Sequence, residues 1–247
     1  MKRGQVALFL IVGMLLVLAV GIVLLFAREP ATTPSSPDAS SLRRFVEACL
    51  EQSGEDAIYG QIALRGGYAY PEGKPGYAQA AGTESPRGYP IAYHLLGGSS
   101  VAPSLELVRQ ESEKLINEKL DSCLDFSEFE VLGYEVDAGA RAVSVTFNEQ
   151  GTGLSLKFPV ELSVEGGDSK VTLSDFSAEL PARVSKVHQI GQCVVNSLAA
   201  GGSKEYAVAS CNSDNDIKVV IARSQYALVY DYSGWPTLRY HFAVELP

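Results

Sequence analysis

The chain has 247 residues, a length that suits an anchoring segment followed by one substantial domain or two small ones. Its formal net charge is −9, and the part beyond the first long apolar run carries 18 basic against 29 acidic residues, a formal charge of −11. A surface this acidic repels phosphate backbones and anionic lipid head groups, which excludes nucleic acid as the main partner.

The chain begins with a predicted leader and transmembrane helix in residues 1–27. Residues 5–27 contain no charged side chain, and at about 1.5 Å per residue they reach roughly 33 Å, enough to cross a hydrocarbon core. This apolar run exceeds the about 7–15 residues of a secretory signal, so we expect an uncleaved anchor, with a removed signal as the alternative. Lys2 and Arg3 precede the span, which predicts a cytoplasmic N-terminus and a main domain outside the cell membrane.

The first residues, Lys2-Arg3-Gly4-Gln5, come directly before the apolar run. This start resembles the class III (prepilin-type) leader of archaeal pilins and related surface proteins. The resemblance implies cleavage after Gly4 on the cytoplasmic side, which would make Gln5 the mature N-terminus and leave the apolar helix on the protein. Many pilins carry a glutamate at the fifth mature position, where this chain has Phe9, a difference that argues against filament assembly. The alternative is a plain signal anchor with an incidental glycine.

Residues 28–40 form a predicted linker between the membrane and the domain. Pro30, Pro34 and Pro37 stand among Ser, Thr and Ala with no large apolar residue, which predicts a solvated, partly extended segment rather than a continued helix. From Ser41 a helix is predicted, because apolar residues recur with the spacing of one buried helical face, and Gly66-Gly67 should end it. The residues of this face are Leu42, Phe45, Val46, Cys49 and Leu50.

The segment from Tyr68 to Pro103 is rich in glycine, proline and tyrosine, which predicts a long excursion with a loose strand at each end. Tyrosine offers a large contact area and a polar tip, so its tyrosines are the candidate partner surface. These residues are Tyr68, Tyr70, Tyr77, Tyr89 and Tyr93. The alternative is that the rings pack against the domain.

Two further long helices are predicted, the first from Ser104, its N-cap, to about Leu124, and the second over residues 182–200. A short helical piece is expected near Tyr206. In six other stretches, apolar and polar residues alternate with a period of two. This alternation predicts strands that are buried on one face and joined as antiparallel meanders. The predicted strands lie at about 143–147, 154–164, 171–180, 217–222, 226–232 and 238–246.

The predicted order of helices and then strands occurs twice along the chain. This order predicts an α+β fold class with helices packed on antiparallel β-meander sheets. The domain from 41–247 is predicted as one unit or as two lobes, 41–180 and 181–247. The layout also resembles that of anchored envelope proteins predicted in small archaeal genomes, which implies an envelope location. The resemblance lies in the leader, Val46-Glu47-Ala48-Cys49-Leu50, Gly66-Gly67-Tyr68 and Pro90-Ile91-Ala92-Tyr93.

All four cysteines follow the predicted span, in a compartment where disulfides persist, and their number is even. Three pairings are open to the sequence. Cys49 and Cys123 both lie on the apolar faces of long helices, and Cys193 is separated from Cys211 by a short connection. We therefore expect the pairs Cys49–Cys123 and Cys193–Cys211.

The sequence contains no pattern typical of a catalytic or metal site. The three histidines, His94, His188 and His241, have no metal-ligand spacing and fall in a predicted loop, helix and strand. Asn212, Asp214 and Asp216 alternate like early calcium ligands, but without the glycine and distal glutamate of a calcium loop they are expected to form turns. We expect no catalytic residue, no metal and no cofactor.

Three functional classes follow from these observations. The first is a membrane-anchored extracytoplasmic domain that binds a protein or glycan partner in the cell envelope. The second is a type IV pilin-like filament subunit. The third is an envelope enzyme whose site is assembled from distant residues without a recognisable motif. The first class is preferred, because the prolines of the linker and the residue at position 9 both argue against a filament.

Overall fold

The structure is a computed structural model. It describes residues 38–72, 77–79, 89–164, 169–212, 214–222 and 226–245. The predicted membrane span, the leader residues Gly4 and Gln5, and linker residues 28–37 lie outside the described residues. Among the residues that are described, no helix combines the length and the apolar character needed to cross a membrane.

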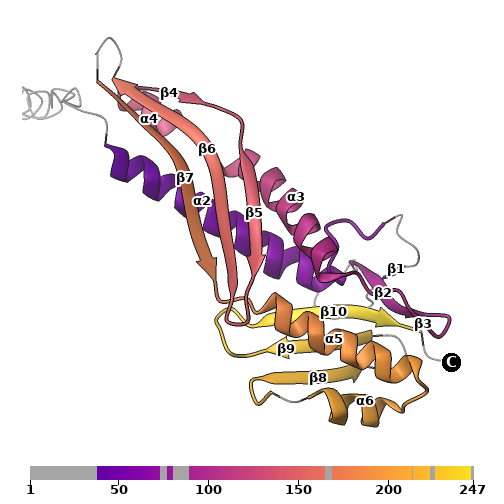
Figure 1. Cartoon of the computed structure of the whole chain (residues 1–247). Helices are drawn as coiled ribbons and strands as arrows, with labels where there is room; N and C mark the ends of the chain where they lie inside the picture. Colours follow the sequence, from indigo (N-terminus) through magenta and orange to yellow (C-terminus); the bar gives the residue numbers. More distant parts are fainter. Residues whose placement is uncertain are drawn as a thin grey trace, which may run out of the picture. The chain divides into compact units, whose positions relative to one another are not determined.

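The described part of the chain has an α+β fold built from two sheets and the helices that cover them (Figure 1). Helices α2 and α3 pack on the first sheet, and α5 packs on the second, with α6 beside α5. The helices are α2 (Ala39–Ala57), α3 (Leu105–Cys123), α4 (Ser127–Val131), α5 (Val184–Ala199) and α6 (Lys204–Cys211). One hydrophobic cluster contains buried residues of both sheets and of the helices α2, α3, α5 and α6.

Helix α2 begins two residues earlier than predicted because Asp38 caps it. The Asp38 carboxylate accepts hydrogen bonds from the Ser40 N–H (2.9 Å) and from the hydroxyls of Ser40 and Ser41, and these bonds lower the pKa of Asp38 to about 2. The helix continues as a π-helical turn, η1 (Ile58–Ile62), and a 3-10 turn, η2 (Ala63–Arg65). Gly66 then ends it with φ 74°, so the predicted stop at Gly66-Gly67 is confirmed.

The first sheet is antiparallel and has β6 at its centre. Strand β7 pairs with one side of β6, while β4 and β5 pair in succession with the other side. Its strands are β4 (Tyr134–Ala138), β5 (Ala142–Phe147), β6 (Thr152–Val164) and β7 (Lys170–Leu180). The predicted strands of this region are all present, but α4 and β4 were not predicted. The break between β4 and β5 lies opposite Pro159, whose carbonyl oxygen accepts the Gly139 N–H at 2.8 Å.

The second sheet is mixed, which corrects the expectation of antiparallel meanders alone. Its order is β1-β2-β10-β9-β8, with the short β3 also paired to β2, and the pair of β10 and β2 is parallel. These strands are β1 (Tyr77–Gln79), β2 (Pro90–Leu96), β3 (Ser99–Ser100), β8 (Ile217–Ala222), β9 (Tyr226–Asp231) and β10 (Leu238–Val244). The predicted excursion therefore contains an inner strand, β2, that pairs with a strand about 150 residues further along the chain.

Strand β10 also differs from its prediction, because it is buried on both faces rather than one. Tyr240, Phe242 and Val244 face the main core, and His241 and Ala243 on the other face are buried as well. Period-two alternation cannot predict burial on the second face, since this depends on which segments cover the sheet.

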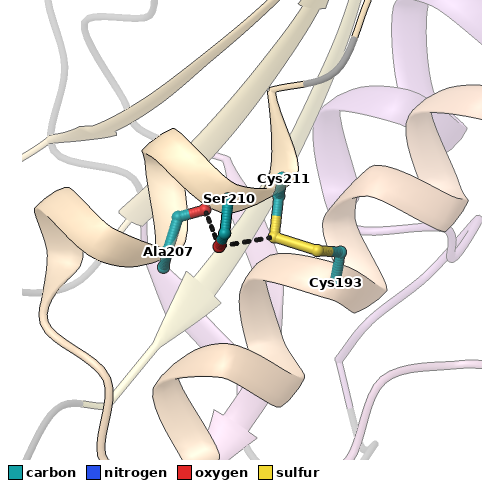
Figure 2. The surroundings of a disulfide bond; sticks show 4 residues. All are labelled: Cys193, Ala207, Ser210 and Cys211. Atoms are coloured by element: carbon teal, nitrogen blue, oxygen red, sulfur yellow. Dashed lines mark hydrogen bonds between the residues drawn. A yellow bond between two sulfur atoms is a disulfide. The ribbon is translucent and has the colours of Figure 1, made fainter.

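Both predicted disulfide pairs are present, and each joins two helices. Cys49–Cys123 links α2 to α3, and Cys193–Cys211 links α5 to α6, each with a Cα–Cα distance of 5.8 Å. Figure 2 shows the second pair beside Ser210, whose hydroxyl donates a hydrogen bond to the Ala207 carbonyl oxygen at 3.3 Å. Two bonds of this kind suit a domain that lies in an oxidising compartment.

Removing either disulfide should destabilise the domain. The two bonds close loops with sequence separations of 74 and 18 residues. By loop-closure entropy, Cys49→Ala with Cys123→Ala should lower the free energy of unfolding by somewhat over about 4 kcal/mol, and Cys193→Ala with Cys211→Ala by about 3 kcal/mol. Urea denaturation of the full chain in detergent, with and without reductant, measures both effects. Wild-type stability that does not change on reduction would contradict the expectation.

Candidate functional site

The tyrosines predicted to form a partner surface do not share one environment. Tyr68 is only 8% exposed and belongs to the core. Tyr70 is exposed and donates a hydrogen bond to Glu118 of α3 at 2.8 Å. Tyr89 and Tyr93 are half-buried against the second sheet. Tyr77 belongs to β1, and its side chain lies outside the described residues.

Tyr89 contributes to a groove that the sequence did not predict. This recognition groove, as we name it, has a volume of about 380 Å³ and lies between the η1–η2 turns, the start of β2 and the turn before β10. Its described lining residues are Tyr59, Leu64, Tyr89, Trp235, Pro236, Thr237 and Arg239. The groove is therefore mostly apolar, with three aromatic rings and one cationic side chain, a composition typical of a binding site.

Trp235 is the most exposed of the large hydrophobic residues that the structure describes, at 88%. It is the only tryptophan of the chain and stands with Pro236 in the turn between β9 and β10. The sequence did not reveal Trp235 as a candidate site residue. Hydrophobic periodicity identifies the flanking strands, but a single residue in a turn has no such pattern. The available signal was a single large aromatic residue placed in a polar turn.

A buried ion pair holds this turn in place. Asp231 at the end of β9 is 1% exposed, and both of its oxygens accept hydrogen bonds from the Arg183 guanidinium at 2.8 and 2.6 Å. The same carboxylate accepts bonds from the N–H and hydroxyl of Ser233. Burial alone would raise the pKa of Asp231, but the Arg183 and Ser233 bonds outweigh it and lower the pKa.

Gly234 adds a second constraint on the position of Trp235. A Cβ atom at Gly234 would lie 2.8 Å from the Pro181 carbonyl oxygen, so only glycine fits without a shift of the backbone. The indole of Trp235 is therefore exposed to solvent, and the backbone that leads into it is fixed at Asp231, Ser233 and Gly234.

Two tyrosines complete the walls of the recognition groove. The Tyr89 hydroxyl lies 2.7 Å from Nδ1 of His241, and the two rings stack with centroids 6.2 Å apart. Burial, and then the charges of Glu55 and Asp231, raise the pKa of Tyr59 to about 12. Both rings are thus held by the domain, and Tyr59 stays neutral at physiological pH.

The three histidines are all buried. His94 lies in β2 and not in the predicted loop, whereas His188 in α5 and His241 in β10 lie in the predicted helix and strand. His94 belongs to β2, stacks on Phe242 at 4.5 Å and places Nε2 2.9 Å from the Gly66 carbonyl oxygen. His188 places Nε2 2.8 Å from the Pro103 carbonyl oxygen. Because a carbonyl oxygen can only accept, each Nε2 carries the proton in the neutral ring. Among the described residues, no cluster of His, Cys, Asp or Glu could hold a metal ion.

The residues suspected of calcium-loop spacing form turns instead, as expected. The Asp214 carboxylate accepts the Asp216 N–H at 3.0 Å, which closes an Asx turn ahead of β8. The same side chain pairs with Arg183 at 3.4 Å. Asp214 therefore supports the Arg183–Asp231 pair beneath the Trp235 turn.

No protein-family model, curated protein or solved structure matches this chain. The functional argument therefore depends on the geometry of the described residues.

Stability should fall in mild acid because of the buried histidines. Burial lowers the pKa of His94 to about 3 and also lowers the pKa of His188, and the two rings lie on either side of Tyr240, with His94 also against Phe242. Each histidine is neutral in the folded state and becomes charged in the unfolded state below about pH 6.5. The contribution of His94 is therefore complete above that pH and is lost as the pH falls toward 3, at a slope that approaches about 1.4 kcal/mol per pH unit, and His188 acts in the same direction.

Urea denaturation at several pH values between about 5 and 6.5 isolates this effect, because ordinary carboxyls titrate below that window. His94→Gln keeps an N–H donor for Gly66 but cannot titrate, so it should clearly reduce the slope of stability against pH. An unchanged slope in this variant would show that His94 does not carry the effect.

Proposed function

We propose that the protein is a membrane-anchored extracytoplasmic binding module whose contact surface is the recognition groove. The exposed Trp235 indole is the observation that carries the proposal. Tryptophan, tyrosine and arginine are the residues that contribute most to binding at protein interfaces, and all three line this groove.

The way in which Trp235 is held supports a role in binding. The buried Arg183–Asp231 pair and the close approach of Gly234 to Pro181 fix the backbone that leads into Trp235. A contact residue whose backbone is already ordered loses less conformational entropy when a partner binds, so more of the contact energy appears as affinity. The arrangement is therefore typical of a preorganised contact residue.

The anchor is supported by the uncharged residues 5–27 and by the basic residues on one side of them. The two disulfides are compatible with an oxidising, extracytoplasmic location for the domain. Asp38 has extended backbone angles (φ −91°, ψ 93°) and caps α2, so this helix begins at Ala39. A helix that starts afresh after a proline-containing segment favours a tethered domain over the continuous rod of a filament subunit.

The anchor and its orientation can be tested directly. Carbonate washing of membranes should leave the protein in the pellet, and protease added to intact cells should remove most of it, because the domain lies outside. If the leader is of the prepilin type, N-terminal sequencing should find Gln5, and Gly4→Val should prevent processing. Extraction by carbonate or full protection from protease would contradict the anchored, outward-facing topology.

Trp235→Ala should abolish partner capture without unfolding the domain. Because the indole is 88% exposed, its removal should leave the thermal midpoint within error of the wild type. Loss of an interface tryptophan costs about 2 kcal/mol or more, so we expect the amount of partner that co-purifies from native envelopes to fall by at least about tenfold. Tyr206→Ala on α6, another exposed aromatic residue outside the groove, is the matched control. Equal co-purification by both variants would exclude the groove as the contact surface.

A further inference from the structure

The recognition groove has the side chains that bind proline-rich segments. Rings of Tyr59, Tyr89 and Trp235 stand with Pro236 along its walls, and Arg239 is the one charged side chain among its described lining residues. Aromatic grooves accept segments in the polyproline II conformation, whose proline rings pack between the aromatic side chains. The carbonyl groups of such a segment have no internal partner, and the indole N–H of Trp235 and the guanidinium of Arg239 are suitable donors for them.

The chain itself contains such a segment in the linker between the predicted span and α2. Its sequence includes Pro34-Ser35-Ser36-Pro37, with two prolines three residues apart. Polyproline II has three residues per turn and rises about 3.1 Å per residue, so these two rings would recur on one side about 9 Å apart.

The Pro34–Pro37 segment cannot reach the groove of its own molecule. Pro37 is followed directly by Asp38, which the cap hydrogen bonds of α2 hold in place. Tyr59 follows 21 residues later, after α2, and at about 1.5 Å per residue this separates it from Asp38 by roughly 31 Å. Pro34 lies four residues from Asp38, a distance of at most about 14 Å in an extended chain.

We propose that the recognition groove of one copy binds the Pro34–Pro37 segment of a second copy anchored in the same membrane. The inference rests on the proposed function, because it names the partner of the same groove. Anchoring confines both copies to one surface, which raises their effective concentration, so a contact that is weak between free molecules suffices. Repetition of this heterologous contact would join neighbouring domains head to tail along the membrane.

Binding of a labelled synthetic peptide tests the contact. The peptide has the sequence of residues 29–40, and fluorescence polarisation follows its binding to the full chain in detergent. Trp235→Ala should weaken binding by at least about tenfold and Arg239→Gln by several-fold, whereas Tyr206→Ala and Arg44→Gln, both outside the groove, should not. A peptide with alanine in place of both Pro34 and Pro37 should not bind, while one with alanine in place of Ser35 and Ser36 should. Failure of the wild-type peptide to bind even at about millimolar concentration, the effective concentration that tethering can supply, would overturn the inference.

Photo-crosslinking in native membranes tests the same contact in the assembled state and separates it from the proposed function. A photoreactive residue replaces Thr237, which lines the groove. We expect crosslinked dimers in which mass spectrometry places the link within residues 28–40 of the second copy, and Pro34→Ala with Pro37→Ala should abolish them. Crosslinks to a different envelope component that are lost in Trp235→Ala would overturn this inference and leave the binding module standing. Absence of any Trp235-dependent crosslink would overturn both.

Discussion

Burial of β10 on both faces is the constraint on which the rest of the described structure depends. The strand pairs with β2 on one side and β9 on the other, so it joins residues 90–96 to the C-terminal part of the sheet. Tyr240 and Phe242 place their rings in the main core, where they meet His94, His188 and the closely packed Gly191 of α5. Because the η2 turn also packs against β10, the same strand positions the end of the α2 segment that carries Tyr59 and Leu64. One strand thereby brings together the three separate stretches of chain that line the recognition groove.

The groove is assembled by long-range contacts, and two further long-range contacts fix the turn that carries its exposed tryptophan. Arg183 stands at the start of α5 and Asp231 at the end of β9, and their bidentate pair fixes the point at which the chain turns toward β10. A buried carboxylate without its partner would be costly, so this pair keeps the turn in a single arrangement. Gly234 lies so close to the Pro181 carbonyl oxygen that a Cβ atom would not fit without a shift. The consequence is an exposed indole that an ordered backbone carries, which suits a preorganised binding surface.

The described domain is compatible with the proposed tethered module. Two disulfides brace the helices that carry the sheets, which suits a domain outside the reducing cytoplasm. The domain begins at a capped helix, and the proline-containing linker precedes it directly. In the proposed assembly this linker has two functions, since it spaces the domain from the membrane and supplies the ligand for a neighbouring copy.

The sequence by itself determined the elements whose signal is local. The apolar face of α2, the Ser104 cap of α3, the stop at Gly66, the alternation along β6 and the α+β class all follow from periodicity and capping within short windows. The two cysteine pairs could also be reasoned from helix faces and spacing. Only the tertiary structure decided the parallel pairing of β2 with β10, the burial of His94 and His241, and the groove around Trp235. These features depend on which distant segments meet, and hydrophobic periodicity records whether a face is buried but not what covers it.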